Sequence, residues 1–201
     1  MNIAVDKNQV SGTHEKSNAF KHEKMAKAGH VLKAVPLPFG DYCEITDEMQ
    51  ETIKRRGEKL KKQDLVGDIK ICVDTKKNLS EVAMNICSKG HGRFRDEVIL
   101  ARKAGARMVT LVEEEGIGSL DEVAAWKNPR LWNYCRKNKI SYGNEEELTA
   151  FVRAGGAKPP VSGEVLEKAM RTMAEKYGVI WSFCKKSDTG KRIVEILSDS
   201  E

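Results

Sequence analysis

The chain has 201 residues, of which 40% are hydrophobic and 32% are charged, and it carries a net charge of +5. This length suits one domain with a substantial core, and the composition is that of an ordinary globular protein, which excludes a disordered chain. The excess of Lys and Arg (35) over Asp and Glu (30) permits a polyanionic partner such as nucleic acid without demanding one.

In the N-terminal third, short apolar runs alternate with polar segments. The runs that predict strands are residues 3–5, 31–37 and 40–45. The segments that predict helices are residues 20–28 and 48–62, the second of them strongly charged and solvated. Residues 7–16 are expected to form a loop, and Pro36 and Pro38 place the second strand at an edge or a strand end.

The next part of the chain predicts a strand followed by a capped helix. Ile69, Ile71 and Val73 alternate with Lys70 and Cys72, which indicates a strand buried on one face. The helix after it has a candidate N-cap with a Glu three residues later, and its apolar residues recur at helical spacing. The cap and the Glu are Asn78 and Glu81.

A second helix and a second strand follow. Residues 90–92 contain two glycines that are expected to end the preceding helix, and residues 93–104 carry the inner apolar stripe of another helix. The continuous apolar run 108–112 predicts a strand at the centre of a sheet that is covered on both faces. The order strand, helix, helix, strand indicates an α/β protein.

The C-terminal part has a weaker pattern at first and a clear one later. Weak signals predict short helices at residues 121–126 and 145–153, a turn at residues 128–129 and a linker at residues 155–160. Clear signals predict a helix around residues 166–177, a strand at 179–184 and a helix at 190–197. We therefore expect one domain, residues 1–201, with a core at 1–113 and a C-terminal α/β extension at 114–201, built on a central mixed β-sheet flanked by helices.

Cysteine usage and the N-terminal residues bear on the location of the protein. The five cysteines have no C-x-x-C spacing, so neither a zinc ribbon nor a disulfide framework is indicated, and reduced thiols are expected. Residues 1–7 lack the apolar segment of a signal peptide, and no run of about eighteen apolar residues occurs. We expect a cytoplasmic protein without a membrane partner.

The end of the alternating strand carries an acid, one spacer and a lysine: Asp74, Thr75 and Lys76. Residues two apart in a strand project to the same side, so a carboxylate that holds Mg²⁺ can lie beside an ammonium group. Metal-dependent phosphodiester cleavage needs this combination. Asp68 is an alternative acid on the same strand, but it follows Gly67 and is better interpreted as a turn residue.

Three motifs in this order resemble the XPF-type nuclease domain, a branch of the PD-(D/E)-x-K superfamily. They are Gly40-Asp41-Tyr42, Val73-Asp74-Thr75-Lys76 and Gly92-Arg93-Phe94-Arg95-Asp96-Glu97. The family signature is G-D, a variable gap, E-R-K and an acid four residues later, with V-D-x-R-E-Q in the first strand. The resemblance covers residues 3–113, and the rest looks like an extension seen in small phage and prophage members. It implies a restriction-endonuclease-like core, Mg²⁺ or Mn²⁺ as cofactor, DNA as partner and a possible homodimer.

The resemblance also assigns roles to individual residues. Asp41 corresponds to the hairpin carboxylate, Asp74 to the acid of E-R-K and Lys76 to its lysine. The two acids and the backbone carbonyl of Thr75 would hold the metal, while Lys76 would orient or deprotonate the attacking water. Asp6, at the end of the first strand, is an additional candidate acid. The remaining positions expected at the same mouth are Glu97 as a catalytic residue and Arg93, Arg95 and Lys77 as DNA-binding residues.

The chain departs from the family pattern in ways that bear on activity. Asp74 replaces Glu, Thr75 replaces Arg, and Ser80 occupies the place of the trailing acid, although Glu81 is adjacent. Residues 7–9 replace R-E-Q, which removes one acid. These changes weaken metal binding in principle.

The leading hypothesis is a Mg²⁺-dependent DNA endonuclease that hydrolyses phosphodiester bonds in branched or structured DNA. The alternative is a catalytically weakened nuclease fold that binds DNA or protein. A third reading is an unrelated α/β interaction protein whose D-x-K is accidental.

Other polar and aromatic side chains receive structural interpretations. The basic run at residues 54–62 is interpreted as a solvated helix face and not as a DNA clamp. Trp126 and Trp132 could stack on bases, although aromatic residues at this density are more often part of a core. The histidines lack ligand spacing and are expected at the surface or in loops. They are His14, His22, His30 and His91.

Overall fold

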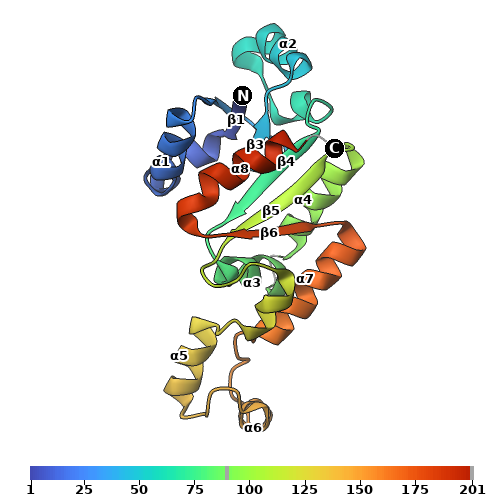
Figure 1. Ribbon diagram of the computed structural model, residues 1–201. Coiled ribbons are helices and arrows are strands. Elements are labelled where there is room, and N and C mark those ends of the chain that lie inside the picture. Colours follow the sequence, from blue (N-terminus) through green and yellow to red (C-terminus); the bar gives the residue numbers. More distant parts are fainter. Residues whose placement is uncertain (89–90, 200–201) are drawn as a thin grey trace.

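The structure of the protein is a computed structural model, which describes residues 1–88 and 91–199, and of residues 12–14 the backbone only. Within these residues a six-stranded mixed sheet lies between two layers of helices (Figure 1). The strands are β1 (Asn2–Asp6), β2 (Val31–Val35), β3 (Tyr42–Glu44), β4 (Ile71–Lys76), β5 (Arg107–Glu113) and β6 (Ile180–Cys184). The α/β class and the mixed sheet are therefore confirmed.

The helices account for most of the remaining chain. The α-helices are α1 (Gly12–Lys27), α2 (Asp47–Arg56), α3 (Leu79–Cys87), α4 (His91–Lys103), α5 (Pro129–Asn138), α6 (Glu145–Arg153), α7 (Gly163–Tyr177) and α8 (Thr189–Ser198). Short 3₁₀ helices lie at Lys7–Val10, Gly57–Lys59, Lys62–Leu65, Leu120–Ala125 and Lys186–Asp188. None of the described helices is both long enough and apolar enough to cross a membrane.

The strand directions bring the polar ends of several strands to one edge. The order in the sheet is β2-β1-β3-β4-β5-β6. β1 and β2 are parallel, β4, β5 and β6 are parallel, and β3 is antiparallel to both of its neighbours. Five strands therefore run the same way, so their carboxyl ends and the start of β3 lie at the same edge of the sheet.

Both faces of β4 are buried. Val73 packs with Met25 of α1 and Ile193 of α8. Cys72, on the other face, packs in the cluster that contains Phe94 of α4. The prediction of a strand buried on one face was wrong, because α4 covers the face on which the less apolar residues lie.

The predicted cap of α3 is confirmed. The Asn78 side-chain oxygen accepts a hydrogen bond of 2.9 Å from the backbone N–H of Glu81. Leu79, Val82 and Ala83 are buried on the inner face of this helix. The predicted break after α3 includes Gly90, which lies outside the described residues, and α4 begins at His91.

The N-terminal polar stretch was wrongly predicted as a loop. It forms a 3₁₀ helix at Lys7–Val10, and α1 begins at Gly12, well before the expected residue 20. The inner face of α1 contains Asn18, which is 4% exposed, and Lys21, which is 8% exposed. A helix whose buried stripe includes an amide and an ammonium group gives no hydrophobic periodicity, so its first half was missed.

The C-terminal part completes the sheet and adds a lobe. β6 pairs with β5, and α8 packs beside α1 on one face, so both predicted elements are confirmed. The predicted turn at residues 128–129 is instead the start of α5, because the Asn128 side chain accepts a hydrogen bond from the Arg130 N–H and Pro129 occupies the first turn. α5 and α6 project as a lobe away from the sheet (Figure 1).

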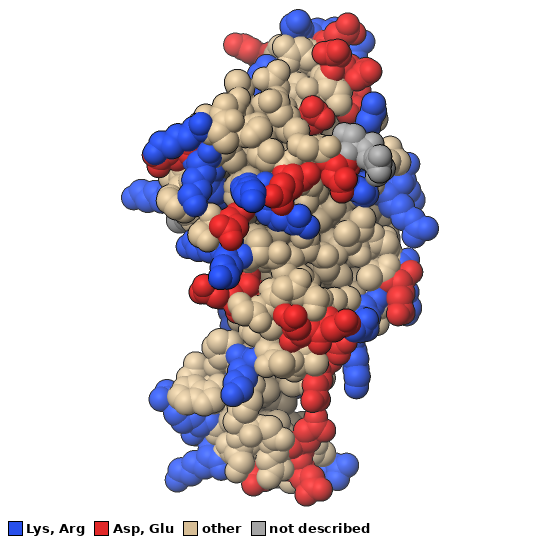
Figure 2. Space-filling model, in the orientation of Figure 1, with Lys and Arg blue, Asp and Glu red and all other residues tan. Residues whose placement is uncertain are grey.

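Charge is unevenly distributed over this lobe. Residues 127–144 contain five basic and no acidic residues. Lys and Arg side chains gather on the side of the lobe that α5 forms, and Asp and Glu gather on the opposite side (Figure 2). With α6 included, residues 127–153 contain six basic and three acidic residues, so this part of the chain carries a net charge of +3.

Candidate functional site

A cleft of about 820 Å³ opens at the edge of the sheet where the carboxyl ends of β1 and β4 meet the start of β3. Most of the residues singled out in the sequence line this cleft, although they are far apart in the chain. These residues are Asp6, Asp41, Asp74, Thr75, Lys76, Arg93 and Glu97. The topology brings them together because β1, β3 and β4 are neighbours in the sheet.

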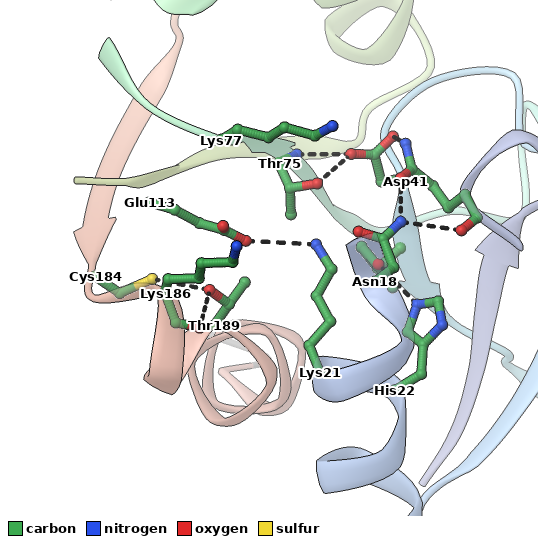
Figure 3. A network of polar contacts seen from close by, with 12 residues as sticks. Asn18, Lys21, His22, Asp41, Thr75, Lys77, Glu113, Cys184, Lys186 and Thr189 are labelled. Carbon is green, nitrogen blue, oxygen red and sulfur yellow. Dashed lines mark hydrogen bonds and ion pairs between the residues drawn. The ribbon is translucent and has the colours of Figure 1, made fainter. Parts of the chain in front are cut away.

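Asp41 is held next to β4 by its backbone and its side chain. Its N–H donates to the Val73 carbonyl at 2.8 Å, and its own carbonyl accepts from the Asp6 N–H at 2.8 Å. One carboxylate oxygen accepts from the Thr75 N–H at 2.8 Å and from the Thr75 hydroxyl at 2.6 Å, as Figure 3 shows. The other oxygen accepts from the Gln9 amide at 2.6 Å. The carboxylate is therefore fixed in position.

Asp74 and Lys76 form a buried ion pair on the α4 side of the sheet. The Lys76 Nζ lies 2.7 Å from the Asp74 Oδ1, and the two side chains are 10% and 7% exposed. The ammonium group also lies over the Phe94 ring, 5.1 Å from its centroid. Asp74 Oδ2 is buried and has no hydrogen-bond partner among the described residues.

Burial and neighbouring charges change the acidity of this pair. Burial raises the pKa of Asp74 from its ordinary value of 3.8 to about 7, the Lys76 ammonium opposes this rise, and the Asp41 and Glu97 carboxylates add to it. Burial alone would lower the pKa of Lys76, but the Asp74 and Asp41 carboxylates hold this pKa above its ordinary value. A positive charge beside Asp74 Oδ2 would favour the ionised carboxylate.

The other acids of the cleft have structural partners. Glu97 accepts a hydrogen bond of 2.9 Å from the Gly40 N–H, which ties α4 to the turn before Asp41. Asp6 accepts from the Asn8 amide at 3.0 Å and lies 3.8 Å from the Lys62 ammonium. Since Lys62 follows α2 and lines the cleft, the end of the basic run reaches the site although α2 itself ends at Arg56.

Two of the expected DNA-binding residues do not line the cleft. Arg95 pairs with its neighbour Asp96, with its Nη2 2.8 Å from the carboxylate. Lys77 is exposed and lines an adjoining pocket. Asp68 forms part of a turn, because its N–H donates to the Leu65 carbonyl, and it does not line the cleft.

The residues of the cleft fit a single divalent cation. The described residues contain no group of three or more His, Cys, Asp and Glu side chains arranged as a metal site. Mg²⁺, however, is often bound through one or two carboxylates and several waters. A carboxylate has about four acceptor sites, so Asp41 keeps one after its three hydrogen bonds, and Asp74 offers its unpartnered oxygen.

The charges that line the cleft also favour a cation. The acidic side chains are Asp6, Asp41, Asp74, Glu81 and Glu97, and the basic ones are Lys62, Lys76 and Arg93. The acidic side chains outnumber the basic ones by two, and a bound cation would favour the ionised form of Asp74, whose pKa is about 7. Asp41 and Asp74 are the residues that would hold this ion.

Several side chains around the site were not predicted from the sequence to belong to it. Gln9 positions Asp41, Phe94 lies under the Lys76 ammonium, and Lys21 of α1 forms an ion pair with Glu113 of β5 at 3.5 Å (Figure 3). Lys21 and Glu113 are 92 residues apart, and neither occurs in a local motif. Only the pairing of the strands and the packing of α1 on the sheet bring them together.

The histidine and tryptophan interpretations are partly corrected. His22 is not at the surface: it lies half-buried in α1, with Nε2 2.9 Å from the Tyr42 hydroxyl, and burial lowers its pKa. The side chain of His14 lies outside the described residues. Trp126 is buried in a core cluster, whereas Trp132 is 50% exposed on α5.

Comparison with protein-family models gave no match, and no curated protein sequence matches this chain. The fold and the cleft define an α/β protein with an acid and lysine pair at one edge of a mixed sheet.

Proposed function

We propose that the protein is a Mg²⁺-dependent endonuclease with a restriction-endonuclease-like core, which hydrolyses phosphodiester bonds in branched or structured DNA. The observation that carries this proposal is the buried Asp74 and Lys76 pair, 2.7 Å apart, in a cleft that also contains the fixed carboxylate of Asp41. An unpartnered acceptor and an adjacent ammonium group suit a reaction that needs a cation and charge stabilisation at one phosphate.

Four residues of the cleft would have distinct parts in this reaction. Asp41 and Asp74 would hold the cation, which supplies Lewis-acid stabilisation of the phosphoryl oxygens. Lys76, held between Asp74 and Phe94, would orient the attacking water and offset the negative charge that develops on the phosphate. Arg93 is exposed at the mouth of the cleft, where it can contact a phosphate oxygen.

The test is a cleavage assay on flap, fork and Holliday-junction DNA with Mg²⁺ or Mn²⁺. We expect the wild-type protein to cut at least one of these substrates and Asp74→Ala to lower the rate by about 100-fold or more. Asp68→Ala is the matched control, because Asp68 lies in the turn before the same strand but outside the cleft. Uncut substrates, or equal rates for Asp74→Ala and the wild type, would end the proposal.

A binding module without cleavage is the second candidate function. The observation that favours it is the hydrogen bonding of Asp41 by Thr75 and Gln9, which occupy three of its about four acceptor sites and leave only one for a cation. In that case DNA binding would fall steeply with salt and would be insensitive to EDTA and to Lys76→Ala. The same substrates therefore separate the two candidates.

A further inference from the structure

A second polar pocket adjoins the cleft on the side of the sheet that α1 and α8 cover. It has a volume of about 270 Å³ and contains three lysines from three different elements, Lys21 of α1, Lys77 after β4 and Lys186 before α8. We call it the lysine pocket. Figure 3 shows Lys21 reaching from α1 toward Glu113.

The lysine pocket is continuous with the proposed nuclease site. Gln9, Thr75 and Glu81 line both the cleft and the lysine pocket. Thr75 donates its hydroxyl hydrogen to Asp41 on one side, and its own side chain borders the lysine pocket. A ligand that passes over the end of β4 would therefore reach both the cleft and the lysine pocket.

The lysines are incompletely neutralised by the protein. Lys21 is 8% exposed, and its ion partner, Glu113, lies 3.5 Å away, longer than the 2.7–2.9 Å typical of close charged pairs. Lys77 and Lys186 are exposed and form no ion pair within the described part of the chain.

The charge balance of the pocket favours an anion. Three lysines exceed the two carboxylates, Glu81 and Glu113, by one positive charge. A phosphodiester group carries one negative charge and would balance this excess. Glu81 lines both sites. Without it the lysine pocket has three lysines and one carboxylate, whereas the cleft has four acidic and three basic groups, so the two imbalances remain opposite and would complement a phosphate and a cation next to it.

We propose that the lysine pocket binds a phosphate group of the DNA strand whose neighbouring phosphodiester lies in the cleft. This inference rests on the proposed function, because it uses the same strand of DNA. It assigns to Lys21, Lys77 and Lys186 the positioning of the strand across the end of β4. Contacts of this kind fix the register of a nucleic acid without reading its sequence.

Binding of DNA with single neutralised phosphates tests the inference. The probe is a fluorescein-labelled duplex with a single-stranded flap, in which one methylphosphonate at a time replaces a phosphate near the junction. Affinity is measured by fluorescence anisotropy in EDTA, so that the result does not depend on cleavage. The variant is Lys77→Gln/Lys186→Gln, because both side chains are exposed and their loss leaves the Lys21 and Glu113 pair intact.

We expect the variant to lower the affinity about tenfold and to reduce the slope of log affinity against log salt by about 1 to 2. One methylphosphonate position should weaken binding of the wild type and have little effect on the variant. Lys185→Gln, an exposed neighbour that does not line the pocket, is the control and should behave as the wild type.

The outcomes separate this inference from the proposed function. Suppose that the wild type cleaves DNA, but every methylphosphonate weakens the binding of the variant as much as that of the wild type. The lysine pocket then does not bind phosphate. If the suppression is observed but no substrate is cleaved, the pocket binds phosphate and the nuclease proposal fails. Equal losses for Lys185→Gln and the double variant would also overturn the inference, because they would show a general charge effect.

Discussion

Replacing Lys76 by Met removes the ammonium group of the buried pair and keeps a side chain of similar length. Breaking a buried ion pair by removing one partner costs about 3–5 kcal/mol of unfolding free energy. The Asp74 carboxylate would then lie 7% exposed without its counter-ion. We therefore expect Lys76→Met to be destabilised by this amount near neutral pH.

The pH dependence of this loss provides the sharper test. A carboxyl whose pKa is higher in the folded than in the unfolded protein binds more protons when folded, so its contribution to stability falls as pH rises through that interval. For Asp74 in the wild type the interval runs from 3.8 to about 7. Without Lys76, which lowers this pKa, the fall continues above pH 7 at up to about 1.4 kcal/mol per pH unit.

Urea denaturation between about pH 6 and pH 9 measures the difference between wild type and variant. We expect this difference to be nearly constant up to about pH 7 and to grow above it. Lys77→Met is the matched control, because Lys77 is the next residue and is exposed, and it should change stability by less than about 0.5 kcal/mol. A difference that stays constant over the whole pH range would refute the coupling between Asp74 and Lys76.

Three further predictions concern the cation, a turn and a cap. Mn²⁺ binding should release a proton from Asp74 and tighten as pH rises from about 6 to 8, because the cation favours the ionised carboxylate. Calorimetry in two buffers counts the released protons, and an affinity for Mn²⁺ that does not change with pH would contradict this prediction. Gly40→Ala should lower the free energy of unfolding by about 2–4 kcal/mol, because φ is +68° and the added Cβ would lie 3.0 Å from the Cys72 Cβ. Gly116→Ala is the control in the same urea assay: its φ is +81° but the space around it is open, so it should cost about 1–2 kcal/mol. Asn78→Ala should cost about 1 kcal/mol by removal of the α3 cap, and a thermal midpoint equal to that of the wild type would disprove it.

Local signals in the sequence were sufficient for much of the fold. The Asn78 cap and the apolar run of β5 each specify an element through neighbouring residues, so α3 and β5 were correctly predicted. α1 was shortened because its inner face contains Asn18 and Lys21, whose partners lie elsewhere in the chain. α5 was missed because its buried face consists of only Leu131 and Cys135.

The candidate site was predictable only where a motif marks it. Asp41, Asp74 and Lys76 were found from local patterns, and the pairing of β3 with β4 places them in one cleft. The lysine pocket has no such pattern, because Lys21 and Lys186 are separated by most of the chain and meet only through the packing of α1 and α8. Its residues could be recognised only in three dimensions.

The small core of the α5–α6 lobe sets how this part of the chain fluctuates. All residues of α6 are described and none is fully buried, and α5 buries two. Segments with few buried contacts open locally at much lower free energy than central strands, so amide hydrogens in the lobe should exchange with deuterium while those of β4 and β5 remain protected. Excursions of the lobe would therefore leave the spacing of Asp41 and Asp74 undisturbed, since both are anchored in the slowly exchanging sheet.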